Sequence, residues 1–196
     1  MGAPEWDDVY GEDARAPGST LDEDDAVFGE DGRTEDSTRH DDGAARDEAL
    51  ASCYRHLGRR DHSVAELRAR LERARLRPQA IEEALAIVID QGYLDDARYA
   101  RLLVEDRREI DGWGAERIRA RLEAAGIAAE LIEEALGGLD AESELAAAIA
   151  LIRKRCELPL AGDRERQRAF AILIQRGFAS EIAYDAVRSG VSSPAP

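Results

Sequence analysis

The adjacent acids Asp95 and Asp96 have the residue types of a general acid/base dyad. They stand at the start of a run of strong helix formers, where carboxylates accept backbone N–H groups and interact favourably with the helix dipole. We therefore expect Asp95 and Asp96 to cap a helix. The alternative is an ion pair with Arg98 or with an arginine of a partner.

The remaining candidates for catalysis or metal binding are few. The three histidines, His40, His56 and His62, share no spacing with cysteine or acid that would build a metal site. Cys53 lies on an apolar helical stripe, which is typical of a buried thiol that acts as a small hydrophobic residue. Gly112-Trp113-Gly114 lacks the lysine that completes a phosphate-binding loop. We expect no catalytic residue, metal or cofactor, and predict a protein that is not an enzyme.

Arginine supplies the candidate binding groups. In the simplest interpretation they form a solvated face paired with neighbouring acids such as Glu66, Glu72 and Glu116. In the functional interpretation some of them contact an acidic protein surface or DNA phosphates, for which the bidentate guanidinium is suited. The candidate residues are Arg59, Arg60, Arg68, Arg70, Arg107, Arg108, Arg117, Arg121, Arg168 and Arg176.

Trp113 completes the set of partner-binding candidates. It stands between two glycines, Gly112 and Gly114, in a predicted turn. Tryptophan is enriched in binding hot spots, so its ring is a candidate anchor for a partner. It could equally fill the seam between two structural units.

A repeat of 51 residues organises the elements that must position these groups. Leu71, Leu122 and Leu173 fall in register, and Gly126 matches Gly177, with Arg75 in the equivalent place. Alanine, leucine, glutamate and arginine dominate from Asp47 to about Gly190, and strand-like alternation is absent. A fixed period of this size predicts an all-α array of three-helix modules, elongated and curved. The expected bounds are 47–93 for module 1, 94–139 for module 2 and 140–190 for module 3, with a flexible tail at 191–196.

Local signals predict where the helices begin and end. Ser63 followed by Glu66 has the spacing of a capping box, in which each side chain bonds to a backbone N–H of the helix start. Gly92, Gly126 and Gly177 stand where helices should end, since glycine adopts the left-handed conformation common after a helix.

The first 46 residues differ from the rest of the chain. They hold 15 acids against 4 arginines, a net charge of −11, whereas the remaining 150 residues carry −4. Because such a segment buries little apolar surface, we expect a disordered acidic leader over 1–46, either solubilising or mimicking DNA. The start of the chain lacks a signal-peptide pattern, and no apolar run approaches the length of a membrane helix. These features predict a cytoplasmic protein, which we expect to be a monomer.

Several motifs together resemble the RecX regulatory protein family. They are Arg60-Asp61-His62-Ser63-Val64-Ala65-Glu66-Leu67, then Gly92-Tyr93-Leu94-Asp95-Asp96-Ala97-Arg98-Tyr99-Ala100, then Gly112-Trp113-Gly114 followed by Arg117-Ile118, Leu122 and Gly126-Ile127, and a weaker Arg176-Gly177-Phe178. The similar region covers about residues 47–190. The long acidic leader departs from the family pattern.

The resemblance implies a protein of tandem three-helix modules that binds the RecA filament along its helical groove. It further implies a modulator, mostly an inhibitor, of RecA ATP hydrolysis, filament extension and strand exchange, and so a regulator of recombination and DNA repair. Single- or double-stranded DNA is a possible further partner. The alternatives are a DNA-binding protein with helix-turn-helix-like modules, which the negative net charge disfavours, and a scaffold joining two other proteins.

Overall fold

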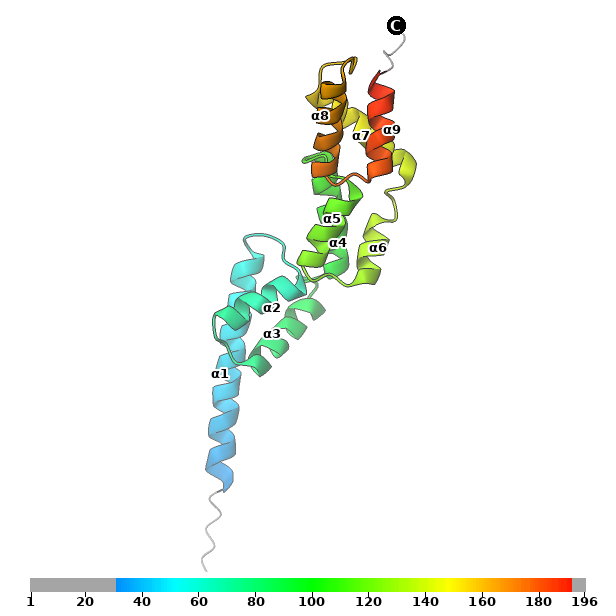
Figure 1. Ribbon diagram of the computed structural model, residues 1–196. Helices are drawn as coiled ribbons and strands as arrows, with labels where there is room; N and C mark the ends of the chain where they lie inside the picture. Colours follow the sequence, from blue (N-terminus) through cyan, green and yellow to red (C-terminus); the bar gives the residue numbers. More distant parts are fainter. Residues whose placement is uncertain (1–30, 192–196) are drawn as a thin grey trace, which may run out of the picture.

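The computed structural model describes residues 31–191, with side chains described for 41–190, and this part of the chain is helical with no strand. Figure 1 shows the order of the helices along the molecule. They are α1 (Asp31–Leu57), α2 (Val64–Arg73), α3 (Pro78–Asp90), α4 (Asp96–Glu109), α5 (Ala115–Ala124), α6 (Ala129–Leu136), α7 (Ala141–Arg155), α8 (Asp163–Gln175) and α9 (Ser180–Val191).

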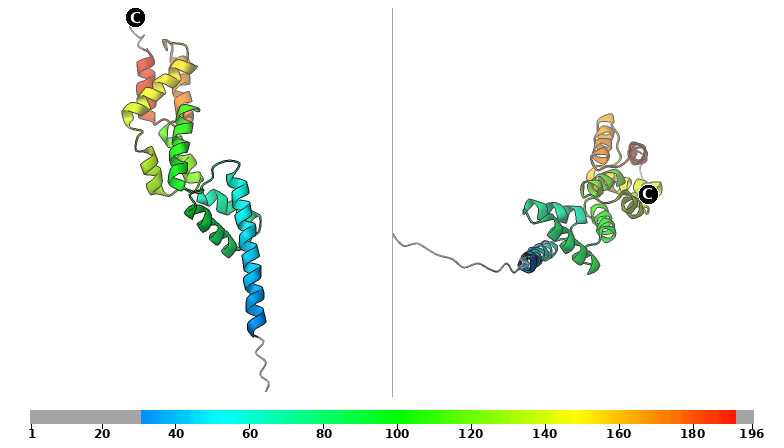
Figure 2. Two further views of the ribbon diagram at one scale, coloured as in Figure 1. Left: turned by 180° about the vertical axis from the view of Figure 1, so that it is seen from behind. Right: turned by 90° about the horizontal axis from the view of Figure 1, so that it is seen from below.

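The helices group in threes, and the three modules follow one another along an elongated body. Within each group, α1–α3, α4–α6 and α7–α9, every helix contacts the other two. Figure 1 places module 1 at one end and module 3 at the other. Seen from below, module 1 lies to one side of the other two, so the array is not straight (Figure 2). The predicted all-α array of three-helix modules is therefore confirmed.

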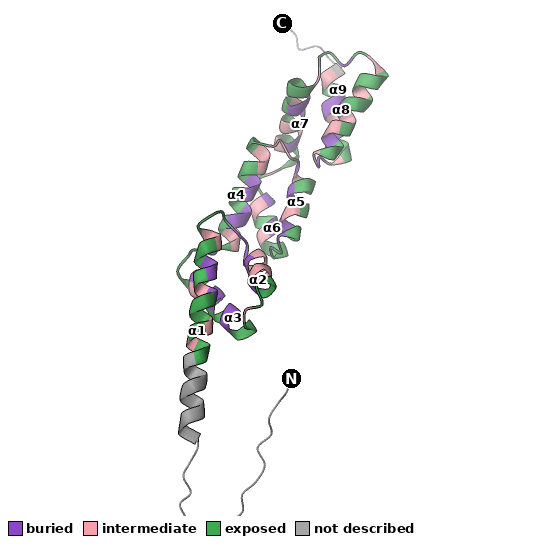
Figure 3. Cartoon of the chain, turned by 90° about the vertical axis from the view of Figure 1, so that its left-hand side faces the viewer, coloured by how far each residue is buried: buried purple, intermediate pink, exposed green. Residues whose placement is uncertain are grey.

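Each module has a hydrophobic core of its own. The repeated leucines Leu71, Leu122 and Leu173 are fully buried, one in each core. Buried residues line the inward faces of the helices, while the outward faces are exposed (Figure 3). A unit of this size buries too little apolar surface to be very stable alone, so contacts between modules add to the stability of each.

The second helix of each module ends in a left-handed turn. Gly126 follows α5 with a φ of 73°, and Gly177 follows α8 with a φ of 81°. In module 1 the equivalent position holds Arg75, whose φ is 60°. Glycine adopts this conformation without the steric cost that a Cβ brings, so module 1 bears a small strain that the other two avoid.

The first helix extends further toward the N-terminus than the sequence predicts. We expected a disordered leader over 1–46, but α1 begins at Asp31, so 31–46 are helical. Ala45 packs against the core of module 1, and Arg77 forms ion pairs with Asp41 and Asp42. These contacts stabilise the helix over 41–46, whose composition alone does not favour a helix. Residues 1–30 and 192–196 lie outside the described part of the chain, and Val191, placed in the tail by the sequence, is the last residue of α9.

Candidate functional site

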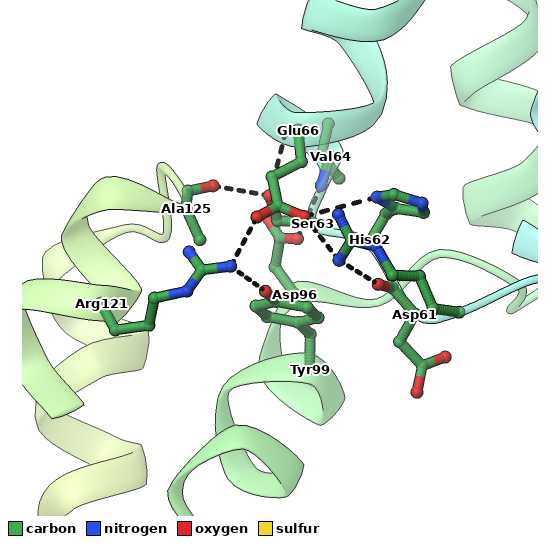
Figure 4. Close-up of polar contacts among 10 residues, drawn as sticks. Asp61, His62, Ser63, Val64, Glu66, Asp96, Tyr99, Arg121 and Ala125 are labelled. Carbon is green, nitrogen blue, oxygen red and sulfur yellow. Dashed lines mark hydrogen bonds and ion pairs between the residues drawn. The ribbon is translucent and has the colours of Figure 1, made fainter. Parts of the chain in front are cut away.

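The first junction, between modules 1 and 2, is centred on the N-terminus of α2. Ser63 caps this helix, since its Oγ accepts the N–H of Glu66 at 3.0 Å. The same Oγ donates to the carbonyl oxygen of Ala125, at the end of α5, at 2.5 Å. The N–H of Val64 donates to Asp96 Oδ1 of α4 at 2.9 Å. One helix start therefore holds two elements of the neighbouring module (Figure 4).

Glu66 takes a different role from the one its spacing predicts. Its carboxylate does not complete a capping box but accepts from Arg121 Nη2 at 2.9 Å and lies 3.3 Å from Arg60 Nη1. Figure 4 shows this carboxylate between the Arg121 guanidinium on one side and the His62 ring on the other. Burial favours protonation of Glu66, but the hydrogen bond from Arg121 and the charge of Arg60 outweigh it and lower the pKa of the carboxyl. The carboxylate is therefore charged and joins α2 to α5.

Asp95 and Asp96 also divide their roles. Asp95 caps α4 by accepting the N–H of Arg98 at 2.9 Å. Asp96, in contrast, reaches across to module 1 and supplies a partner to Val64. Burial raises the pKa of Asp96, with the hydrogen bond from Val64 acting in the opposite direction and the charge of Asp95 adding to the rise. Both carboxylates therefore position helix starts, and among the described contacts neither forms an ion pair with the Arg98 side chain.

The second junction, between modules 2 and 3, uses equivalent positions. The N–H of Gly114, 51 residues after Ser63, donates to the carbonyl oxygen of Arg176 at 2.8 Å. The N–H of Ala115, 51 residues after Val64, donates to Glu144 Oε2 of α7 at 3.2 Å. At both junctions, therefore, the second helix of one module begins against the end of the second helix of the next, and a carboxylate from the next module caps it.

Arg108 joins α4 to α7 inside the second junction. Its guanidinium forms an ion pair with Glu144, donates to the carbonyl of Ser143 at 3.0 Å, and lies over the ring of Phe178. The Arg108 and Glu144 side chains are 15% and 8% exposed, so both charges are largely withdrawn from water. A buried pair of this kind fixes geometry, because either charge left alone would be costly.

Trp113 and its arginine neighbours also lie at the second junction. The guanidinium carbons of Arg117 and Arg107 lie over the indole ring, 4.2 and 5.3 Å from its centroid, and the ring is partly buried against the core of module 2. Arg117 also donates to the carbonyl of Gln175, and Arg176 to the carbonyl of Asp111. Contacts within the chain are therefore made by Arg107, Arg108, Arg117 and Arg176. Of these four partner-binding candidates only Arg108 is withdrawn from water, since Arg117 is exposed and the Arg107 side chain is 41% exposed.

The other arginine candidates fall into two groups. Arg68 forms a bidentate pair with Glu82 on the surface of module 1, at 2.8 Å for both contacts. Arg59, Arg70 and Arg168 have no hydrogen bond or ion pair to a described side chain. Because these three guanidinium groups would not have to break an ion pair within the chain first, they are the candidates most available to a partner.

Two hollows gather arginines of modules 1 and 2 beside the first junction, and of the three unpaired candidates Arg70 lines one of them. One, of about 370 Å³, is lined by Arg60, Arg70, Arg73, Glu66 and Glu123 among other residues. The other, of about 330 Å³, is lined by Arg60, Arg107, Arg121, Asp61 and Asp106 together with Tyr99. Arg60 lines both hollows, and each hollow is lined by three arginines and two acidic residues. We call these two hollows the arginine surface, which suits carboxylate or phosphate oxygens.

Some residues that matter for this arrangement carry no sequence signal. Glu144 is buried and joins two modules, yet nothing in its surroundings in the sequence sets it apart from exposed glutamates. Arg73 lines the arginine surface although it was one of many arginines on α2. Within residues 41–190, His, Cys, Asp and Glu form no group of three placed to hold a metal ion. No helix in the described part of the chain has the length and apolar character needed to span a membrane.

Comparison with known proteins decides the family. The chain is 37% identical over 141 residues to the regulatory protein RecX of Thermus thermophilus, covering 72% of this chain and 91% of that protein. It is 39% identical over 143 residues to the regulatory protein RecX of Deinococcus radiodurans, covering 73% and 68% of the two chains. The chain belongs to the RecX family of regulatory proteins.

Family models and solved structures agree with the modular organisation. The model of the first three-helix domain of RecX matches residues 49–86, and that of the second matches residues 95–136. The crystal structure of RecX from Lactobacillus salivarius aligns with a TM-score of 0.65 at 18% identity, over 75% of this chain and 97% of that one. A second crystal structure of a regulatory protein RecX gives 0.64 at 20% identity, over 80% and 77%. The arginine surface lies between the two matched RecX domains.

Proposed function

We propose that this RecX-family regulator binds the RecA nucleoprotein filament along its groove and inhibits ATP hydrolysis, filament extension and strand exchange. Membership of the regulatory family supports a role in regulation. The observation that carries the proposal is the repeated junction, which holds successive modules in one elongated body. A body of this shape suits a partner that repeats along an axis, because several weak contacts combine through effective concentration.

The arginine surface is the part of the molecule that we propose touches the filament. Arg70 holds no ion pair with the described residues and lines the larger hollow, and Arg59, equally without an ion pair, directly precedes Arg60, which lines both hollows. Guanidinium groups of this kind pair with carboxylates of a protein or with phosphates of DNA. Contact with DNA held in the filament is part of the proposal. The protein acts as a monomer in the cytoplasm, and it performs no chemical step itself.

A titration of RecA ATPase activity on single-stranded DNA tests the proposal. The expected result is inhibition by the full chain at fewer molecules than RecA subunits. The double variant Arg59→Gln/Arg70→Gln should require at least about tenfold more protein, since two charged contacts of 1 kcal/mol or so are lost. Arg153→Gln/Arg155→Gln is the matched control, because these arginines are exposed on α7 and should leave inhibition unchanged.

The outcomes separate the proposal from its alternatives. No change in ATPase activity at saturating protein would contradict RecA regulation and favour the scaffold. A salt-dependent gel shift with one duplex sequence, in the absence of RecA, would favour the DNA-binding protein. Omitting residues 1–30 from the chain asks whether the acidic N-terminal segment changes the inhibition.

A further inference from the structure

A pair of surface positions repeats in all three modules, and in module 3 its residue types change from charged to aromatic. Positions 68, 119 and 170 are 51 residues apart, as are positions 82, 133 and 184. In module 1 this pair is Arg68 and Glu82, joined by two hydrogen bonds of 2.8 Å. In module 2 it is Arg119 and Glu133, which also form a bidentate ion pair, one contact being 3.1 Å. Each pair connects the second helix of its module to the third.

In module 3 the corresponding residues are aromatic. Phe170 on α8 and Tyr184 on α9 replace the arginine and the glutamate. Tyr184 is 67% exposed, and Phe170 is partly buried against the module core. Ile174, one turn after Phe170 on α8, is also exposed. In modules 1 and 2 the two charges at these positions pair with each other. In module 3 the same positions present apolar surface to water.

The two rings line a hollow of about 510 Å³ that we call the aromatic groove. Its lining residues are Phe170, Ser180, Glu181, Tyr184 and Asp185. Asp185 accepts from Arg188 at 2.8 Å, and Glu181 has no partner among the described residues. No arginine or lysine lines the groove, in contrast to the arginine surface beside the first junction.

We propose that the aromatic groove binds a segment of another protein in which arginine or lysine adjoins apolar residues. The apolar side chains would cover Phe170 and Tyr184, and the cation would lie over an aromatic face within reach of Glu181. The charge of the groove decides between occupants. The unpaired Glu181 carboxylate, with no cation in the lining of the groove, repels nucleic-acid phosphates and equally repels the acidic N-terminal part of this chain. This site is separate from the arginine surface and does not depend on the proposed action on RecA.

The test is binding of a fluorescein-labelled peptide of alternating leucine and arginine to the full chain, followed by anisotropy. The decisive variant is Phe170→Arg/Tyr184→Glu, which installs the ion pair of modules 1 and 2 without changing net charge. It should fold, since two modules already carry this pair, and should weaken binding by about tenfold or more. Tyr93→Gln, at an exposed tyrosine of module 1, is the control and should leave the affinity unchanged.

A second variant keeps the test decisive if the double variant does not fold. Glu181→Arg, at an exposed residue, should weaken binding of the arginine peptide and strengthen binding of a matched peptide with glutamate in place of arginine. Equal affinity for wild type and both variants would place the peptide elsewhere, on the acidic leader for example, and overturn the proposal. So would sedimentation showing a wild-type dimer that Phe170→Arg/Tyr184→Glu dissociates, since the groove would then bind a second copy of the chain.

Discussion

The N–H of Gly114 donates a hydrogen bond to the carbonyl oxygen of Arg176 at 2.8 Å, and this bond joins module 2 to module 3. The equivalent residues of the first junction, Ser63 and Ala125, also meet, but there the contact runs through the serine hydroxyl at 2.5 Å. At the first junction, therefore, a side chain reaches the neighbouring module, whereas at the second junction the backbone of Gly114 itself makes the contact. The two junctions are equivalent in position and different in how closely the modules approach.

Gly114→Ala should separate modules 2 and 3. A Cβ at Gly114 would lie 2.6 Å from the nitrogen of Phe178 and closer still to the carbonyl of Gly177, and backbone cannot move aside as a side chain can. We expect a loss of about 2 kcal/mol or more in the free energy of unfolding, measured by denaturant titration followed by circular dichroism. Gly138→Ala, where a Cβ meets nothing within 4 Å, is the control and should change it by less than about 0.5 kcal/mol. Equal stabilities would contradict the close approach.

The periodic features of this fold could be predicted from the sequence, and the contacts between modules could not. The bounds of the helices depend on local signals: apolar spacing, Pro78 at a helix start, and glycines such as Gly126 and Gly177 in turns. The junctions depend on how whole helices cross. Asp96 was therefore expected to cap its own helix, whereas its carboxylate caps α2 of the neighbouring module.

The candidate site shows the same limit more strongly. Arg108 and Arg59 look alike in sequence, both in adjacent arginine pairs near helix ends. In the structure Arg108 is withdrawn into a junction with Glu144, and Arg59 is exposed. The helical content of 31–46 was missed for a related reason, since Asp41 and Asp42 pair with Arg77, a residue some 35 positions away. Contacts this distant in sequence leave no periodic signal.

Glu66→Gln should weaken the first junction. The substitution keeps the shape of the side chain but removes the charge that Arg121 and Arg60 face. Because the carboxylate is largely buried, we expect a loss of about 1–2 kcal/mol in the free energy of unfolding, from denaturant titration. Glu82→Gln removes a similar pair with Arg68 on the surface and should cost less than about 0.5 kcal/mol. A larger effect at Glu82 than at Glu66 would contradict a structural role for the junction.

Arg108→Met should cost more than any exposed arginine substitution, about 3 kcal/mol, since it leaves the Glu144 carboxylate buried without its partner. Adding Glu144→Gln in the same chain removes that orphaned charge and should recover part of the loss, because a neutral amide is cheaper to bury. The measurement is a double-mutant cycle on denaturant midpoints. Strictly additive losses would show that the two side chains do not interact.

His62 should make stability fall as the solution is acidified below neutrality. Its side chain is 2% exposed, and burial together with the charges of Arg60 and Arg70 lowers its pKa from the ordinary 6.5, although Glu66 acts in the opposite direction. A lowered pKa means that the unfolded chain takes up the proton first. The stabilisation is therefore complete above about pH 6.5 and is lost as the pH falls toward the lower folded pKa.

His62→Gln should flatten this part of the stability curve. The measurement is the free energy of unfolding by denaturant at intervals between pH 7 and pH 5, a window above the ordinary pKa of Glu66 at 4.5. His56→Gln is the matched control, because the pKa of His56 is also lowered but its ring is less buried, so the variant should retain most of the slope. If His62→Gln kept the full wild-type slope while His56→Gln lost it, the acid sensitivity would reside in the partly exposed ring at the end of α1 and not at the first junction.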